Sequence, residues 1–216
     1  PECMSALKAI YPRFGLTPLV ADLAKYAITT NGSPSCSAWP YSTNAAAVRA
    51  KDFCCDREPF GRTTIREILG LFFLISDPKS SPPAKAFWQH TGLGASSRQA
   101  AIALKKEPPP APDAGENARS VICKRLGNIY GCHEKFVQLH PSGMAALNTA
   151  LSAIRALHPG KPTLQIGFPY VDVLKLPEII FEGSHLLLSN ELDSLAEELD
   201  LKQPAAVIVE LPSNPM

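Results

Sequence analysis

The sequence predicts an α/β fold with a largely parallel sheet, preceded by a segment of mixed α+β character. Strand-like and helix-like segments alternate between residues 118 and 211, as in chains that build a parallel sheet. A proline-rich run at residues 107–115 separates this part from a less regular one. The chain of 216 residues is 45% hydrophobic with a net charge of +1, a composition that favours a packed core over disorder.

Two elements are predicted before the proline run. Asn44–Asp52 has the composition of a short helix, with Asn44 as its N-cap and alanines after it. Gly70–Ile75 is a continuous apolar run of strand length, so both faces of this strand are expected to be buried. Residues 107–115 predict an exposed, polyproline-like connection, because proline lacks the N–H donor and fixes φ. We therefore divide the chain into an N-terminal segment, 1–117, and an α/β domain, 118–216.

Helices and strands are predicted to alternate in the α/β domain. The first helix, 118–130, carries an apolar side and is closed by Gly131. The last strand is apolar throughout, so it is expected to be buried. The apolar side of the first helix consists of Val121, Ile122, Leu126 and Ile129. The other predicted helices are 143–157, 171–181 and 191–200, and the strands are 136–139, 163–167, 185–188 and 205–211.

Composition also limits the classes of partner. The 21 basic residues are balanced by 20 acidic ones, whereas nucleic-acid binding usually requires a basic excess. No run approaches the roughly 18–20 apolar residues of a membrane span, and the first residues do not resemble a signal peptide. None of the six cysteines forms a C-x-x-C pair. We expect a cytoplasmic protein with buried, reduced thiols and no metal site.

The segment His140-Pro141-Ser142-Gly143-Met144 lies between a predicted strand and a predicted helix. Ser142 is suited to cap the helix, and Gly143 allows a ligand to approach the backbone. The unpaired N–H groups of a helix start bind anions without any basic side chain. The same sequence is also typical of turns that bind nothing.

Three motifs in order resemble the Cys/Met-metabolism family of pyridoxal-phosphate enzymes. They are Ser142–Ala146, Tyr170 and Glu210–Pro215. That family includes cystathionine γ-synthase, homoserine sulfhydrylases, cystathionine lyases and methionine γ-lyase. The resemblance is strongest over 118–216 and looser over 1–117. Further segments resemble a fungal-type, cystathionine γ-synthase-like branch: Tyr11–Phe14, Phe87–Gly92, Ser96–Arg98 and Ile166–Lys175.

The resemblance implies the large domain of a fold-type-I (aspartate-aminotransferase-like) transferase with pyridoxal 5'-phosphate as cofactor. The implied reaction is γ-replacement on an O-acylated homoserine by cysteine or another sulfur, carbon or nitrogen nucleophile. Two alternatives remain open. One is a β- or γ-lyase acting on cystathionine or methionine, and the other is a non-catalytic relative that serves as an interaction subunit. The family's active sites imply a homodimer or homotetramer.

The resemblance also implies roles for individual residues. The N–H groups of Gly143 and Met144, at the turn that begins with Ser142, hold the cofactor phosphate. Tyr170 is the implied catalytic residue, stacking on the pyridine ring and assisting proton transfer. Asn214 contacts the cofactor's phenolic oxygen or the substrate carboxylate. The alternatives are a core aromatic for Tyr170 and an ordinary Ser-Asn-Pro turn for Asn214.

The sequence departs from the family's pattern at the tyrosine and arginine that usually bind the cofactor phosphate of the neighbouring subunit. His90 stands where the family has a tyrosine, and Gly92 stands where it has an arginine. Arg98 is the best cationic substitute, although an ordinary surface arginine is an equal alternative. Val171 and Asp172 replace the glycines that usually follow the stacking tyrosine.

The family's Schiff-base lysine lies in an S-x-T-K segment, which this sequence does not contain. Lys105, Lys106 and Lys124 have no such context, so they are expected to be solvated surface charges. The resemblance places the lysine, and the aspartate that binds the pyridinium nitrogen, beyond Met216. We therefore expect the sequence to be part of a longer subunit.

Overall fold

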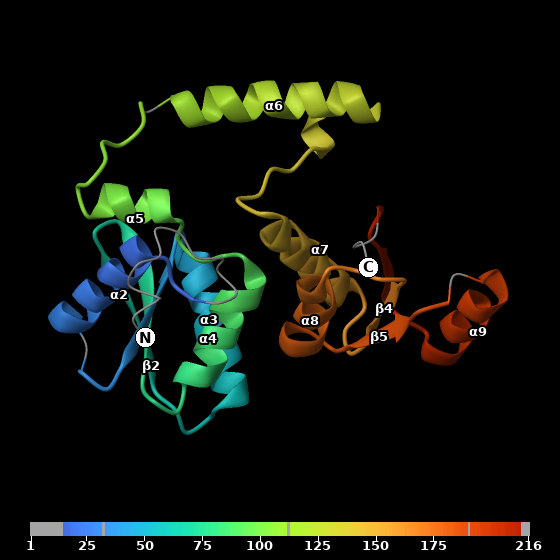
Figure 1. Ribbon diagram of the computed structural model, residues 1–216, viewed down its shortest axis with the longest axis horizontal. Coiled ribbons are helices and arrows are strands. Elements are labelled where there is room, and N and C mark those ends of the chain that lie inside the picture. Colours follow the sequence, from blue (N-terminus) through green and yellow to red (C-terminus); the bar gives the residue numbers. More distant parts are fainter. Residues whose placement is uncertain (1–14, 32, 112, 190, 213–216) are drawn as a thin grey trace.

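The computed structural model describes residues 15–31, 33–111, 113–189 and 191–212. The fold is α/β, with one antiparallel and one parallel sheet of three strands each. Helices lie between the two sheets, and one long helix stands apart from both (Figure 1).

The antiparallel sheet belongs to the N-terminal segment and has the strand order β1-β3-β2. Its strands are β1 (Ser37–Tyr41), β2 (Thr63–Ile68) and β3 (Leu71–Ser76). The predicted strand is β3, and its central position buries every residue in it except the half-buried Phe72, as expected. Leu69 and Gly70 form a two-residue turn between β2 and β3, with φ of 53° and 74°. Two positive φ values are typical of the type I′ hairpin turn.

Helices cover both faces of this sheet. Figure 1 shows α2 (Pro18–Asn31) on one side and α3 (Asn44–Arg57) and α4 (Ser81–Thr91) on the other. The Trp39 and Trp88 rings lie 5.9 Å apart, which joins β1 to α4. A short helix, α5 (Ser97–Ala103), packs on α2.

The predicted N-cap of α3 is wrong by one residue, although the helix begins at Asn44 as predicted. Thr43 is the N-cap, because its backbone is extended and its hydroxyl accepts the Ala46 N–H at 3.2 Å. Asn44 is therefore the first helical residue, and the helix continues past Asp52 to Arg57.

The connection after α5 is exposed and has no regular structure at residues 107–111, as predicted. The prediction is wrong at Ala114 and Gly115, which form the first turn of the next helix, so that helix starts four residues before the predicted position 118. The connection leads to α6 (Ala114–Tyr130), which ends at Gly131 with φ of 65°.

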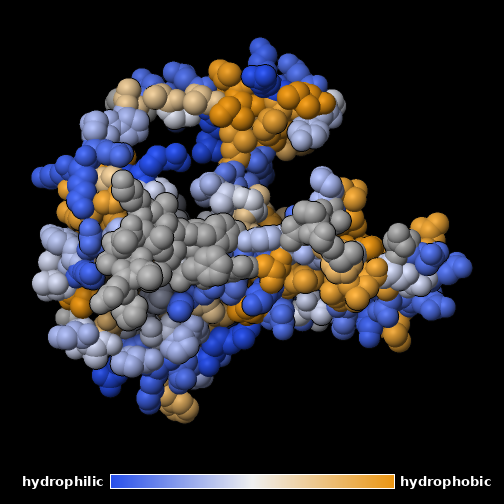
Figure 2. Space-filling view, viewed as in Figure 1, coloured by the Kyte–Doolittle hydropathy of each residue, from blue (hydrophilic) through white to orange (hydrophobic). Residues whose placement is uncertain are grey.

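The apolar side of α6 is not covered: Val121 is 66% exposed and Ile129 is 65% exposed. The reason is that α6 packs on the short 3-10 helix η1 (Glu134–Phe136) rather than on a sheet. Figure 2 shows apolar side chains gathered over these two helices.

The strand predicted at 136–139 is wrong. Phe136 instead ends η1, since the Val137 N–H donates to the Glu134 carbonyl at 3.0 Å, and residues 137–139 have no regular structure. The His133 ring accepts the Lys135 N–H at 3.2 Å and caps this turn. These bonds use backbone groups that a strand would offer to a neighbour.

The parallel sheet has the order β5-β4-β6, and its elements lie within two residues of the predicted ranges. The last strand is not buried as expected, because β6 is at an edge and Val207 and Val209 are 41% and 50% exposed. The strands are β4 (Thr163–Ile166), β5 (Ser184–Leu187) and β6 (Ala206–Val209), and the helices are α7 (Gly143–Leu157), α8 (Val171–Ile180) and α9 (Leu192–Lys202).

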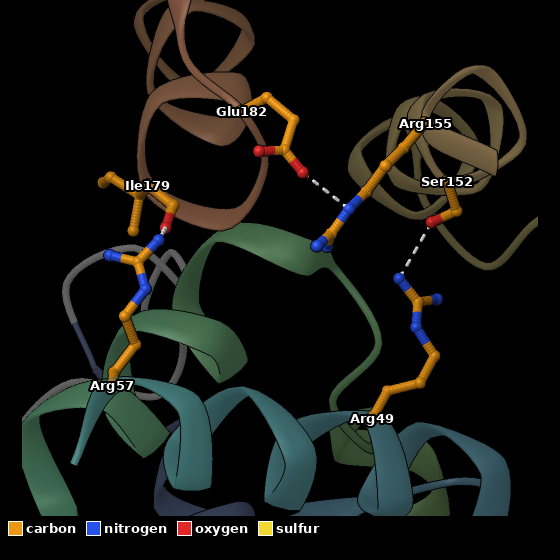
Figure 3. Close-up of polar contacts among 6 residues, drawn as sticks. All are labelled: Arg49, Arg57, Ser152, Arg155, Ile179 and Glu182. Atoms are coloured by element: carbon orange, nitrogen blue, oxygen red, sulfur yellow. Dashed lines mark hydrogen bonds and ion pairs between the residues drawn. The ribbon is translucent and has the colours of Figure 1, made fainter. Parts of the chain in front are cut away.

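The N-terminal segment packs against the helices of the parallel sheet. One Nη of Arg49 on α3 donates to Asn148 Oδ1 at 3.3 Å and to Ser152 Oγ at 2.9 Å. Eight residues along α3, Arg57 donates to the Ile179 carbonyl at 2.8 Å (Figure 3). Leu151 on α7 belongs to the same buried core cluster as residues of the antiparallel sheet. The core therefore extends across the two segments that the proline run separates in sequence.

The thiols are less buried than expected. Of the described cysteines, all free, Cys54 is buried, Cys36 and Cys123 are half-buried, and Cys55 and Cys132 are exposed. Burial raises the pKa of Cys54 to about 12, with a smaller contribution from Cys55. Among the described helices, none combines the length and hydropathy that a bilayer crossing requires.

Candidate functional site

The connections of the parallel sheet create a crevice at the carboxyl ends of its strands. Helix α8 leads from β4 to β5 on one side, whereas α9 leads back past β4 to β6. Right-handed crossovers in opposite directions place α8 and α9 on opposite faces, as Figure 1 shows. In α/β sheets ligands bind at such a reversal, outside the carboxyl ends of the strands.

A cavity of about 440 Å³ lies at this position. Its polar wall brings together Ser142, Gly143 and Met144 from the start of α7, Tyr170 from the start of α8, and Glu210 after β6. Four of these five residues are sequence-predicted site residues. The apolar wall consists of Leu147, Val173, Ile208 and Val209.

The start of α7 has the geometry of an anion site. Ser142 is extended and is the N-cap, with its hydroxyl accepting the Ala145 N–H at 3.1 Å. The N–H groups of Gly143 and Met144 precede the first intrahelical hydrogen bond, so they remain available to a ligand. A Cβ on Gly143 would meet no atom within 4 Å, which leaves the approach to these N–H groups open.

Tyr170 and Glu210 connect α8 to β6. The Tyr170 N–H donates to Glu210 Oε2 at 2.5 Å. This carboxylate lies at the start of α8, where the helix dipole favours a negative charge. Glu210 was not predicted to have a role in the site, although its position directly after an apolar strand indicates a residue at the carboxyl edge of the sheet.

Gly92 packs directly against the start of α7. It ends α4 with φ of 67°, and its carbonyl oxygen accepts the Ser142 hydroxyl at 3.5 Å. A Cβ at this position would lie 2.7 Å from the backbone nitrogen of Ala145. Gly92 thus supports the start of α7 by close backbone contact.

A second polar contact joins α4 to α8. Nδ1 of His90 on α4 lies 3.5 Å from Oδ1 of Asp172 on α8, and both side chains are buried. His90 is outside the lining of the cavity. His90 and Gly92 therefore join the end of α4 to the starts of α8 and α7 through two separate contacts.

The remaining sequence-predicted residues do not join this cluster. Arg98 is exposed in the first turn of α5 and is not part of the cavity lining. Asn214 lies outside the described residues. Lys105, Lys106 and Lys124 are exposed, as expected.

The cavity fits part of a phosphorylated, aromatic cofactor. Backbone donors, an aromatic side chain and an apolar wall are present. However, the described lining includes no lysine, arginine or histidine, and it does include one carboxylate, that of Glu210. In the described part of the chain, His, Cys, Asp and Glu side chains form no group of three that could hold a metal ion.

No protein-family model, no curated protein and no solved structure matches this chain.

Proposed function

We propose that this chain binds pyridoxal 5'-phosphate at the start of α7 and belongs to a fold-type-I enzyme that performs γ-replacement on an O-acylated homoserine. One observation carries the proposal. Two different motifs of the resemblance contain Ser142–Met144 and Tyr170. These residues line a single cavity at the carboxyl edge of the parallel sheet. Residues far apart in sequence thus converge where α/β proteins bind ligands.

Each residue of the polar wall has a role in this proposal. The N–H groups of Gly143 and Met144 bind the phosphate, and the dipole of α7 adds to the attraction. Ser142 fixes the helix start through its bonds to Ala145 and Gly92. Tyr170 stacks on the cofactor ring, and Glu210 holds Tyr170 in place through its backbone N–H.

When bound, pyridoxal 5'-phosphate supplies an electron sink for charge that develops on the amino-acid substrate. The apolar wall, with Val173 and Ile208, excludes water from one side of the ring. A cationic group for the phosphate and the Schiff-base lysine come from outside the described lining in this proposal. By the resemblance, the cationic group comes from a neighbouring subunit, and the lysine lies in an S-x-T-K segment.

Binding can be tested with pyridoxamine 5'-phosphate, whose amine does not form adducts with surface lysines. Gly143→Pro deletes one phosphate donor while keeping the helix, because proline is favoured at the first helical position and Ser142 is already extended. Loss of a charge-assisted hydrogen bond is expected to weaken binding by about tenfold. The matched control is Leu192→Pro at the exposed first position of α9, after the extended Glu191.

Calorimetric titration that detects no pyridoxamine 5'-phosphate binding, or equal affinities for the two proline variants, would contradict the assigned site. The reaction is tested separately on the native protein reconstituted with pyridoxal 5'-phosphate. With an O-acylated homoserine and cysteine, the proposal expects cystathionine. Release of ammonia and a keto acid from cystathionine or methionine would identify a lyase, and neither reaction would indicate a non-catalytic subunit.

A further inference from the structure

Three exposed side chains form a row on one face of β2. Arg62 directly precedes the strand, and Thr64 and Arg66 follow at every second position, so all three point to the same side. Thr64 lies opposite Ile75 of β3, and Ile75 lies opposite Ala38 of β1. Ile75 and Ala38 are buried on this face, whereas the row on β2 lies at its exposed rim.

A cavity of about 390 Å³ lies at this row. Its described lining also contains Ser33 and Cys36 from the loop before β1, Asp77 after β3, and Ile75 as an apolar part of the wall. The volume falls within the range of roughly 300–1,000 Å³ that is usual for small-molecule sites. The hydroxyls of Ser33 and Thr64 add neutral donors to the two guanidinium groups.

The positive charge of the row is not neutralised within the described part of the chain. Neither Arg62 nor Arg66 forms an ion pair with another described residue. Asp77 is the only carboxylate in the described lining, and its Oδ1 accepts the Ser80 N–H at 2.8 Å. Glu67, the next charged residue on β2, points to the opposite face. The cavity therefore carries a net positive charge and favours an anion.

The two guanidinium groups are placed to converge above Thr64. Arg62 and Arg66 are four residues apart, which separates their Cα atoms by about 13 Å along a strand. Extended arginine side chains reach far enough from both ends to meet between them. Nη1 of Arg66 donates to the Ile65 carbonyl at 3.3 Å, so this side chain bends back towards the middle of the row. A guanidinium group offers parallel N–H donors that match two oxygens of a phosphate or carboxylate.

The donors of the cavity suit a phosphate monoester better than a carboxylate. A monoester has three terminal oxygens and close to two negative charges at neutral pH. A carboxylate has one charge and two oxygens, which accept fewer hydrogen bonds than two guanidinium groups and two hydroxyls supply. We propose that this cavity binds a small phosphate monoester, with Arg62 and Arg66 holding the phosphate and Thr64 donating between them. The proposal does not rest on the cofactor site at the start of α7.

Cys36 provides a local readout, because its half-buried thiol lines this cavity. Bound methyl phosphate should slow the alkylation of Cys36 by iodoacetamide, since it blocks access and its charge disfavours the thiolate. Cys55 and Cys132 are exposed outside the cavity lining and serve as internal references. Peptide mass spectrometry of the 216-residue chain measures each rate, with the ionic strength held constant.

Arg62→Gln and Arg66→Gln should each raise the methyl phosphate concentration that half-protects Cys36 by about tenfold, because charge-assisted hydrogen bonds are lost. Arg125→Gln, on the exposed surface of α6, removes the same charge away from the cavity and should leave this concentration unchanged. Acetate, which matches methyl phosphate in its methyl group, should protect Cys36 far less. Circular dichroism verifies that the variants are folded.

Protection of Cys36 that weakens in both β2 variants and persists in Arg125→Gln supports the proposal. A wild-type chain whose Cys36 is not protected by millimolar methyl phosphate overturns it, as does equal protection by acetate or an equal effect of the three arginine variants. Gly143→Pro separates this site from the proposed cofactor site, because it should leave the protection of Cys36 unchanged. Loss of protection in Gly143→Pro would assign the phosphate to the start of α7 and overturn the proposal.

Discussion

A Cβ placed on Gly92 would lie 2.5 Å from the hydroxyl oxygen of Ser142, the residue that caps the proposed phosphate-binding helix. Gly92 also has φ of 67°, which side chains other than glycine adopt at a cost. Two independent constraints therefore require glycine at this position. The contact makes the end of α4 a support for the start of α7.

Gly92→Ala should destabilise the protein more than Gly131→Ala does. Both glycines end a helix at φ near 65°, but a Cβ on Gly131 meets no atom within 4 Å. Gly131→Ala should lower the free energy of unfolding by about 1 kcal/mol, because alanine disfavours the left-handed conformation. Gly92→Ala adds displacement of α7 and should cost about 3 kcal/mol. Urea unfolding measures the difference, and equal costs would show that the contact is loose.

Arg49→Met should lower the free energy of unfolding by about 2 kcal/mol. The change removes the hydrogen bond to Asn148, whose side chain is buried, together with the bond to Ser152. Burial, and to a smaller extent the charge of Arg155, lowers the pKa of Arg49. The charge of Arg49 therefore adds no stabilisation beyond its hydrogen bonds. Arg57→Met on the same helix is the control, and its exposed bond should contribute no more than about 0.5 kcal/mol. A larger loss of unfolding free energy in Arg57→Met than in Arg49→Met would contradict this prediction.

Leu69→Asn should stabilise the β2–β3 hairpin. Leu69 has φ of 53° and is 43% exposed, so it carries backbone strain without the compensation of burial. Asparagine before Gly70 is favoured in a type I′ turn, and relief of about 1 kcal/mol should raise the Tm by roughly 2–4 °C. Leu69→Ala, which keeps the strain, should not raise it. A Tm that rises equally in both variants would assign the gain to lost apolar exposure.

Stability should fall as the pH rises above about 9. The pKa of Cys54 is about 12 in the folded chain because of burial, so the unfolded state releases this proton first. The contribution is complete below the unfolded pKa and is lost towards pH 12, at up to about 1.4 kcal/mol per pH unit. Burial raises the pKa of Tyr41 as well, which adds to the slope. Urea unfolding between pH 8 and 11 should show a shallower slope in Cys54→Ala than in Cys55→Ala, and equal slopes would exclude Cys54 as a cause.

The elements of the parallel sheet could be predicted because each strand and helix is encoded locally by its own apolar period. The N-terminal segment was harder. Pro40 argues against a strand, yet it is tolerated in β1 because this is an edge strand and its carbonyl accepts the Ala95 N–H at 2.9 Å. Helix α2 was missed although Val20, Leu23 and Ala27 lie at helical spacing and are buried.

The site was predictable only where one short motif contains the chemistry. Ser142, Gly143 and Met144 cap a helix through neighbours in sequence, so their arrangement could be foreseen. The bond between Tyr170 and Glu210 and the contact between Gly92 and Ser142 join distant segments. Such contacts depend on how the layers pack, which local periodicity does not encode.

The strand order β5-β4-β6 also affects the order in which the two sheets form. The two-residue turn lets β2 and β3 pair as a local hairpin, which forms in microseconds. By contrast, β4 acquires its second neighbour, β6, only after α8, β5 and α9. A chain leaving the ribosome can therefore complete the antiparallel sheet, which ends at Ser76, before any residue that lines the proposed cofactor cavity is synthesised, and the walls around Tyr170 close last.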